Sequence, residues 1–181
     1  VLREVAMEHG TETTWEQVIA IGEMIGVRDE KRVATQLKRY GVSLVQGMGT
    51  LKGASAESGE TRVEVSDETG NTRTLSARSM VLSTGSKARR LPGIPFDNQC
   101  IFDSDSINGL SGRPESLLIQ GTGVIALEYA TIFATMGVAV TVVSRKERST
   151  ILPNLDNSLK DALLGDLEDR GVKLIFGCNV T

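Results

Sequence analysis

The sequence predicts an α/β protein in two parts, a helix with a small antiparallel meander followed by the start of a parallel βαβ sheet. Apolar residues recur at helical spacing over residues 14–40, which indicates an amphipathic helix. Short runs typical of strands, separated by turn residues, follow between positions 43 and 75. From Ser116 onward the order is strand, glycine turn, long helix and strand, which is how a βαβ unit opens.

The helix of the first part has a clear end and a weak middle. Gly41 is well placed to terminate it. Gly22 and Gly26 lower the helical propensity near its centre. One interrupted helix and two shorter helices therefore both fit the pattern.

The meander is predicted from strand-like runs bounded by turns. The runs are residues 43–46, 61–65 and 72–75, and the turn-rich segments between them are residues 57–59 and 68–71. A further apolar run at residues 80–83 is expected to be a strand. Residues 87–95 hold two of the four prolines and are expected to form an extended connection.

The second part is predicted to be the first half of a Rossmann-like domain. Its strand, turn, helix, strand, helix and strand are expected at residues 117–119, 121–123, 124–136, 139–143, 159–170 and 172–176. We place the boundary between the two parts after residue 112. The predicted domains are therefore residues 1–112 and 113–181.

Composition and charge exclude several classes of protein. A chain of 181 residues with 40% hydrophobic and 24% charged residues can bury a core. Its net charge of −3 does not supply the basic surface that nucleic acid requires, so no nucleic-acid partner is expected. The longest apolar run, residues 138–143, is far shorter than the ~18 residues of a transmembrane helix, so no membrane span is predicted.

Cysteine and histidine content argues against a metal site. Cys100 and Cys178 are far apart and form no paired motif. The single histidine, His9, precedes Gly10 in what is predicted to be an exposed loop. We therefore predict no metal.

The first residue is Val1, and no signal pattern follows it. We therefore expect the chain to be part of a longer polypeptide or to associate with another chain. A soluble protein of the cytoplasm or an organelle interior is favoured over a secreted one, and the sequence names no compartment.

The strongest motif is a small-residue fingerprint between a predicted strand and a predicted helix. Its G-x-G-x-x-A pattern, in a context typical of dinucleotide binding, comprises Gly121, Thr122, Gly123, Val124, Ile125 and Ala126. Gly121 permits a tight turn, Gly123 lets backbone N–H groups approach a pyrophosphate, and Ala126 lets helix and strand pack closely. The helix N-terminus supplies free N–H donors to phosphates. The alternative is a strand–helix turn that binds nothing.

The residue that follows the second strand of such a fold selects the ribose. A carboxylate there binds the 2′-hydroxyl of NAD, whereas a nearby arginine accommodates the 2′-phosphate of NADP. This sequence has Ser144 at that place, followed by Arg145, Lys146 and Arg148. The absence of a carboxylate favours NADP over NAD, and the alternative is a solvated basic turn.

Glu128 lies in the first turns of the helix that follows the glycines. An acid there can be a favourable partner of the helix dipole, worth about 0.3–1 kcal/mol. Because bound phosphates would repel it, a specific role is the other interpretation.

Four segments together resemble the pyridine nucleotide-disulfide oxidoreductase family of flavoproteins. They are residues 81–86 (VLSTGS), 101–107 (IFDSDSI), 121–132 (GTGVIALEYATI) and 171–172 (GV). Within the family the sequence is most similar to the soluble pyridine nucleotide transhydrogenases and next to the dihydrolipoamide dehydrogenases. The resemblance covers nearly the whole chain and is weak before Gly41.

The resemblance implies a partial two-domain flavoprotein fold that binds FAD and NADP, or NAD. Residues 1–112 would be an incomplete FAD-binding domain and residues 113–181 a partial NAD(P)-binding domain. The implied FAD contacts are Met48 and Gly49 beside the adenine, and Thr84, Gly85 and Ser86 along the flavin. Glu128 matches a catalytic-site carboxylate near the junction of nicotinamide and flavin, where the family pairs it with a lysine.

Other parts of the family's active site fall outside this sequence. In the family's register Val1 follows the cysteine motif and its lysine, so the first flavin-binding βαβ unit and the partner of Glu128 would precede it. The second flavin motif and the dimerisation domain would come after Thr181, so the flavin would be shared with parts beyond these residues.

Two functions remain open at this stage. The first is part of an oxidoreductase that transfers hydride between NAD(P)H and flavin, transhydrogenase-like or dihydrolipoamide-dehydrogenase-like. The second is a non-catalytic truncated relative that serves as a structural subunit of a larger assembly, with the glycine turn kept for packing.

Overall fold

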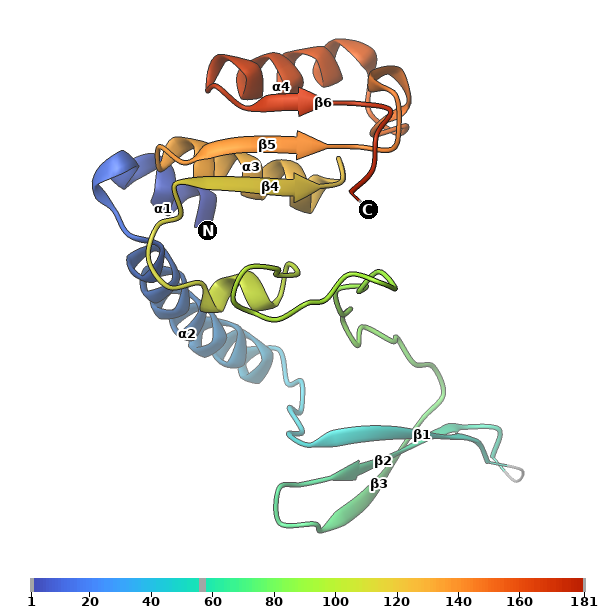
Figure 1. Cartoon of the computed structure of the whole chain (residues 1–181). Helices are drawn as coiled ribbons and strands as arrows, with labels where there is room; N and C mark the ends of the chain where they lie inside the picture. The colour runs from blue at the N-terminus through green and yellow to red at the C-terminus, as the bar shows by residue number, and fades with distance from the viewer. Residues whose placement is uncertain (1, 56–57, 181) are drawn as a thin grey trace. The chain divides into compact units, whose positions relative to one another are not determined.

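The structure, a computed structural model, describes residues 2–55 and 58–180, and these form two compact units (Figure 1). The first unit comprises Val1–Arg28 and Lys87–Thr181, and the second comprises Asp29–Ser86. These units reflect contacts within this chain. The predicted boundary after residue 112 concerns the domains of the family fold and stays a prediction.

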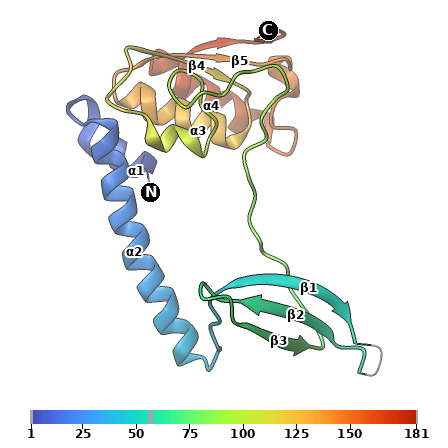
Figure 2. The same ribbon diagram turned by 60° about the horizontal axis from the view of Figure 1, so that its bottom comes forward.

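The first unit contains a parallel three-stranded sheet. Its strands are β4 (Ser116–Gln120), β5 (Ala139–Val143) and β6 (Lys173–Ile175), in the order β4-β5-β6. The crossover helices are α3 (Val124–Thr135) and α4 (Asn157–Asp169), and both lie on the same face of the sheet (Figure 2). This arrangement confirms the predicted βαβ start.

The two faces of this sheet differ in burial, as alternating side chains require. Ile119 pairs with Val142, which pairs with Leu174. Val142 belongs to the hydrophobic core beneath the helices, and Ile119 and Leu174 are partly buried against that core. Leu118 points to the opposite face and is 55% exposed. One face of the sheet is therefore covered by helices from the described residues.

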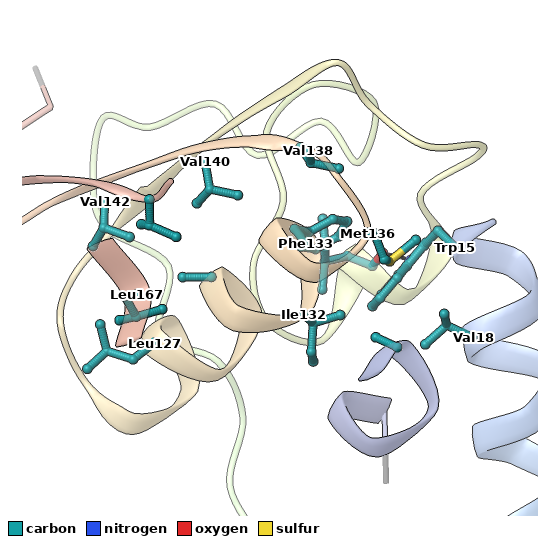
Figure 3. Packing of buried hydrophobic residues seen from close by; sticks show 14 of the residues in the cluster. Trp15, Val18, Leu127, Ile132, Phe133, Met136, Val138, Val140, Val142 and Leu167 are labelled. Carbon is teal, nitrogen blue, oxygen red and sulfur yellow. Dashed lines mark hydrogen bonds between the residues drawn. The ribbon is translucent and has the colours of Figure 1, made fainter. Parts of the chain in front are cut away.

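An aromatic cluster joins the start of α2 (Trp15–Arg39) to α3 (Figure 3). Trp15 is fully buried, and its ring centroid lies 4.7 Å from that of Phe133. The Trp15 indole N–H donates to the carbonyl of Ile107 at 2.9 Å, in the short 3-10 helix η2 (Ser106–Gly109). Such aromatic pairs contribute about 0.5–1.5 kcal/mol beyond the area they bury, so this cluster anchors the N-terminal segment.

A short helix, α1 (Leu2–His9), precedes the cluster and packs on α3. The sequence did not predict it, and His9 is the last residue of this helix instead of a loop residue, although it is exposed as expected. Eight residues do not form a stable helix alone. Burial of Val5 and Ala6 in the core stabilises it.

Helix α2 continues unbroken through Gly22 and Gly26, so the interpretation as two helices was wrong. Glycine costs roughly 1 kcal/mol in a helix interior, which the surrounding helix formers offset. None of the helices in residues 2–55 and 58–180 combines the length and the apolar character that crossing a bilayer demands.

The second unit contains the predicted antiparallel meander. Its strands are β1 (Met48–Ala54), β2 (Thr61–Ser66) and β3 (Thr72–Ala77), in the order β1-β2-β3. The predicted turn at residues 68–71 is confirmed, because the Asp67 carboxylate accepts the backbone N–H groups of Thr69 and Asn71 at 2.9 Å. The other predicted turn includes Glu57, which lies outside the described residues.

Two predicted strands are irregular in the structure. Residues 43–46 precede β1, whose first residue, Met48, pairs with Ser66 at the end of β2. The partner strand therefore ends where β1 begins. Residues 80–83 follow the end of β3 at Ala77 and pair with none of the described strands. Apolar character alone did not make either segment a strand, because a strand needs a partner.

Helix α4 begins two residues before the predicted start. The carboxylate of Asp156 accepts the backbone N–H of Ser158 at 2.8 Å and so caps the helix. The hydroxyl and the backbone N–H of Ser158 hold the pKa of Asp156 below its ordinary value of 3.8.

Candidate functional site

The glycine turn, Gly121 to Gly123, connects β4 to α3. Gly121 has φ +115°, a conformation that side chains disfavour. Its backbone N–H donates to the carbonyl of Val143 at 2.8 Å. The turn is thereby fixed to the end of the neighbouring strand β5.

Gly123 caps the N-terminus of α3 and has an ordinary backbone conformation, with φ −76° and ψ 169°. A Cβ atom placed on it would meet no atom within 4 Å. Neither the backbone nor the packing of the described residues therefore requires glycine here. The free space at a helix N-terminus suits a pyrophosphate, so the residues present fit a dinucleotide.

Two buried hydroxyls link the glycine turn to the end of β5. Thr122 is 8% exposed and Ser144 is 3% exposed, and their hydroxyl oxygens lie 3.1 Å apart. The backbone N–H of Lys146 donates to the Ser144 hydroxyl, also at 3.1 Å. The hydroxyl of Ser144 is thus directed into the protein.

We call Ser144, Arg145 and Lys146 the basic turn. The side chains of Arg145 and Lys146 are exposed, and within the described residues neither makes a hydrogen bond or an ion pair. Both are therefore available to an anion.

Arg148 differs from these two residues. Its guanidinium donates to both carboxylate oxygens of Glu168, at 2.6 and 3.3 Å, and lies 6.0 Å from the ring centre of Phe176. The hydrogen bonds raise the pKa of Arg148 and lower that of Glu168. The guanidinium of Arg148 is therefore already paired with a carboxylate of the protein, unlike the cations of the basic turn in the described part of the chain.

Glu128 lies one turn into α3, with an exposed side chain. It borders a groove of about 530 Å³ that is also lined by Arg3, Val124 and residues 152–155. Leu152 has φ +44°, a conformation uncommon for this residue type. We call this space the α3 groove.

Tyr129 follows Glu128 in the helix. Burial, followed by the negative charges of Glu128 and Asp105, raises the pKa of the Tyr129 phenol. The phenol therefore stays protonated at neutral pH and donates to the carbonyl of Ser104 at 3.1 Å. This bond connects α3 to the segment at residues 101–107.

That segment has a structural role in the chain. The Asp103 carboxylate accepts the backbone N–H of Ser106 at 2.8 Å and pairs with Arg90 at 2.7 Å. The Ser106 N–H and then the Arg90 guanidinium lower the pKa of Asp103 well below its ordinary value. Arg90 also lies over the Phe96 ring, 5.2 Å from its centre.

The residues expected to contact FAD lie in the second unit. Met48 begins β1 and is 73% exposed, and Gly49 pairs with Val65 of β2. The other three expected contacts are exposed and irregular in backbone, and they are Thr84, Gly85 and Ser86. In the first unit, the glycine turn and the basic turn contact each other, and Glu128 lies on the helix that follows the glycine turn.

Sequence reasoning missed two features near these residues. The pairing of the Thr122 and Ser144 hydroxyls was not predicted, although both residues follow adjacent strands, whose carboxyl ends meet at one edge of a parallel sheet. The role of Gly47 was also missed. It has φ +142°, and a Cβ on it would lie 2.5 Å from the Ser66 carbonyl oxygen, so only glycine fits before β1.

The chain is similar in sequence to enzymes of which it covers less than a third. It is 36% identical over 115 residues to a soluble pyridine nucleotide transhydrogenase of Colwellia psychrerythraea, covering 64% of this chain and 24% of the relative. It is 38% identical over 130 residues to dihydrolipoyl dehydrogenase 3 of Pseudomonas aeruginosa, covering 72% and 27%. The alignment with the transhydrogenase of Mycobacterium bovis covers 82% of this chain and 30% of the relative, at 33% identity.

Solved structures share the fold at lower sequence identity. LpdA from Mycobacterium tuberculosis matches 91% of this chain and 36% of its own chain, with a TM-score of 0.76 and 24% identity. The HOCl-induced flavoprotein disulfide reductase RclA from Escherichia coli matches 99% of this chain and 38% of its own, with a TM-score of 0.70 and 22% identity.

The family comparison covers almost every residue. Residues 3–181 match the model of the pyridine nucleotide-disulphide oxidoreductases. The predicted resemblance and the predicted α/β flavoprotein fold are thereby confirmed. With this match and the relatives that agree with it, the chain belongs to the pyridine nucleotide-disulphide oxidoreductase family.

Proposed function

We propose that the first unit holds a nicotinamide dinucleotide, with the pyrophosphate at the N-terminus of α3, as part of an FAD-dependent oxidoreductase. The observation that carries this proposal is the free space at Gly123, where a side chain would fit but glycine stands. A bare backbone is what a pyrophosphate needs in order to reach the N–H groups of the helix. The helix dipole adds a favourable partial positive charge.

NADP is the proposed nucleotide, in preference to NAD. The residue after β5 is Ser144 in place of a carboxylate, and Arg145 and Lys146 are exposed beside it. A guanidinium binds a phosphate through two parallel hydrogen bonds. The two cations would therefore attract the anionic 2′-phosphate of NADP, whereas the neutral 2′-hydroxyl of NAD would gain little binding energy from them.

Glu128 is proposed to act at the nicotinamide end. It lies on the same helix as Gly123 and borders the α3 groove, which also contains Arg3. A carboxylate in such a place can hold a cation or accept a proton near the reacting ring. By resemblance to the family, the cation that Glu128 holds would be the ammonium group of a lysine.

The FAD contacts proposed for Met48, Gly49, Thr84, Gly85 and Ser86 are partial. Thr84 and Ser86 are exposed and lie outside the regular elements, and Gly49 lies in β1, where it pairs with Val65 of β2. When both cofactors are bound, they supply hydride transfer, which needs the reacting atoms about 3–3.5 Å apart.

The relatives carry the names transhydrogenase and dihydrolipoyl dehydrogenase, so either type of reaction fits this proposal. The alternative function was a structural subunit with the glycine turn kept for packing. A glycine kept for packing would have a neighbour against its Cα, and Gly123 has none within 4 Å of a Cβ position. The relatives give that alternative no support.

The test is nucleotide binding by the native polypeptide, measured by calorimetry with NADP⁺ and NAD⁺. Gly123→Val should abolish binding of both, because the valine side chain would occupy the space of the pyrophosphate. The fold should be unchanged, because the backbone at Gly123 is ordinary and its Cβ position is open.

Gly26→Val is the matched control, since this glycine is exposed on α2 and also has no neighbour within 4 Å of a Cβ. It should leave both affinities unchanged. Full affinity in the Gly123→Val protein would contradict the proposed site.

A further inference from the structure

The basic turn is held in place from several sides. The Ser144 N–H donates to the Ile175 carbonyl at 2.9 Å, and the Ser144 carbonyl accepts from the Cys178 N–H at 3.0 Å. The Lys146 carbonyl accepts from the Gly177 N–H at 3.3 Å. The residues on both sides of Arg145 are thus fixed to the segment that follows β6.

The Ser144 hydroxyl adds a connection that the backbone does not make. It accepts the Lys146 N–H within the basic turn and contacts the Thr122 hydroxyl in the glycine turn, each at 3.1 Å. Because Ser144 is 3% exposed, these bonds have little competition from water, and a buried polar group left without its partner is costly. The hydroxyl therefore ties one turn to the other.

We propose that Ser144 is a positioning residue, whose buried hydroxyl couples the glycine turn to the basic turn and fixes how Arg145 and Lys146 meet a 2′-phosphate. This inference rests on the proposed dinucleotide function. It gives Ser144 an indirect role: its hydroxyl is directed at Thr122 and the Lys146 N–H, and Arg145 and Lys146 make the contact with the ligand. The glycine turn is also held by the Gly121 N–H, which donates to the Val143 carbonyl at 2.8 Å. Loss of the Ser144 hydroxyl should therefore act mainly on the basic turn, and so on the recognition of the 2′-phosphate.

Two small nucleotides separate these effects in the native polypeptide. 5′-AMP and 2′,5′-ADP differ only in the 2′-phosphate, and neither needs flavin for binding. Ser144→Ala should lower the affinity for 2′,5′-ADP by about tenfold, the equivalent of a lost hydrogen bond. The affinity for 5′-AMP should change by less than about twofold. Calorimetry gives both dissociation constants.

Thr122→Val is the second variant, and it carries the test if Ser144→Ala fails to fold. It removes the contact between the two hydroxyls but leaves Ser144 to accept the Lys146 N–H. The affinity for 2′,5′-ADP should therefore also fall, but only by about threefold. The double variant Ser144→Ala with Thr122→Val should bind 2′,5′-ADP almost as well as Ser144→Ala alone. The contact between the two hydroxyls is already lost in the single variant, so the two effects should not add.

Thr131→Val is the matched control. Its hydroxyl is buried too, but it donates to the Leu127 carbonyl within α3 and does not contact either turn. It should not change the ratio of the two affinities.

The outcomes separate the two proposals. Failure of the wild type to bind either nucleotide, or equal affinity for both, would overturn the proposed NADP site and this inference with it. A wild type that prefers 2′,5′-ADP, with the preference intact in Ser144→Ala or Thr122→Val, would overturn the positioning role alone.

Discussion

Arg145 lies between two residues whose backbones are fixed, and its guanidinium is exposed. Arg145→Ala should therefore weaken the binding of NADP⁺ much more than that of NAD⁺. The expected loss of binding free energy for NADP⁺ is about 1.5–3 kcal/mol, the value of a hydrogen bond to a charged group. The physical reason is that NAD⁺ lacks the phosphate that the guanidinium would bind. Titration calorimetry on the native polypeptide measures both affinities.

Arg148→Ala is the control at this scale, because its guanidinium is already bound to Glu168. It should leave the ratio of NADP⁺ to NAD⁺ affinity unchanged. An equal loss of both nucleotides in Arg145→Ala, or no loss of either, would identify the basic turn as a solvated surface feature.

The sequence predicted residues of the site better than their contacts. The fingerprint predicted the turn at Gly121 and the helix start at Gly123, because the spacing of its glycines is a local pattern of the sequence. The pairing of the Thr122 and Ser144 hydroxyls depends on two adjacent strands that end at one edge, and no local pattern carries that information. Gly47 is similar, because its need for glycine arises from Ser66, which comes from another strand.

At the scale of an element, the cap of α4 makes the stability of the helix depend on pH. The pKa of Asp156 is lowered from its ordinary 3.8 in the folded protein, mainly by the Ser158 hydroxyl and N–H. A lowered pKa means that the ionised cap stabilises the helix fully above pH 3.8 and that this contribution is lost as the pH falls through the folded-state pKa. Amide protection in the first turn of α4 should therefore decline in acid.

Asp156→Asn provides the comparison. Asparagine can still accept the Ser158 N–H but does not titrate, so protection in this turn should stay nearly constant over the same pH range. Amide exchange followed by NMR from pH 6 downward distinguishes this cap from other acidic groups of the helix, such as Asp166 and Glu168, which pair with Arg170 and Arg148. An identical acid response in both proteins would show that the Asp156 cap is not the cause.

Elements whose pattern is local were predicted closely, and those that depend on distant partners were not. The strand at residues 139–143 has the bounds expected from its apolar run. Helix α1 was missed because its stability comes from burial of Val5 and Ala6 beside α3. The runs at residues 43–46 and 80–83 are apolar enough for strands, but the described strands offer them no partner.

At the scale of the molecule, the chain spans about a quarter of its transhydrogenase and dihydrolipoyl dehydrogenase relatives, 24% and 27%. We expect residues 1–181 alone to be colourless and to oxidise neither NADPH nor NADH, because the expected flavin contacts here are few. We also expect poor solubility or association with another chain, since the second unit exposes large apolar side chains. They include Val42, Leu44, Met48, Leu51, Leu75, Val81 and Leu82.

The measurement is an absorption spectrum and a steady-state assay after incubation with FAD. A soluble pyridine nucleotide transhydrogenase to which the chain is similar, treated in the same way, is the positive control. Flavin bands near stoichiometry in residues 1–181, or turnover above that of free flavin, would contradict this prediction.

The bond from the Trp15 indole to the Ile107 carbonyl spans 92 residues of sequence, and the aromatic partner Phe133 comes later still. During synthesis, at about 5–20 residues per second, Trp15 therefore waits on the order of 5–20 s before its acceptor exists. Over that interval Trp15, the largest of the fully buried side chains in the described residues, is an unpacked apolar side chain on a nascent chain. Ribosome-bound chains that stop before Ile107 should consequently be recognised by chaperones that bind exposed aromatic residues, and chains that extend past Phe133 should be released.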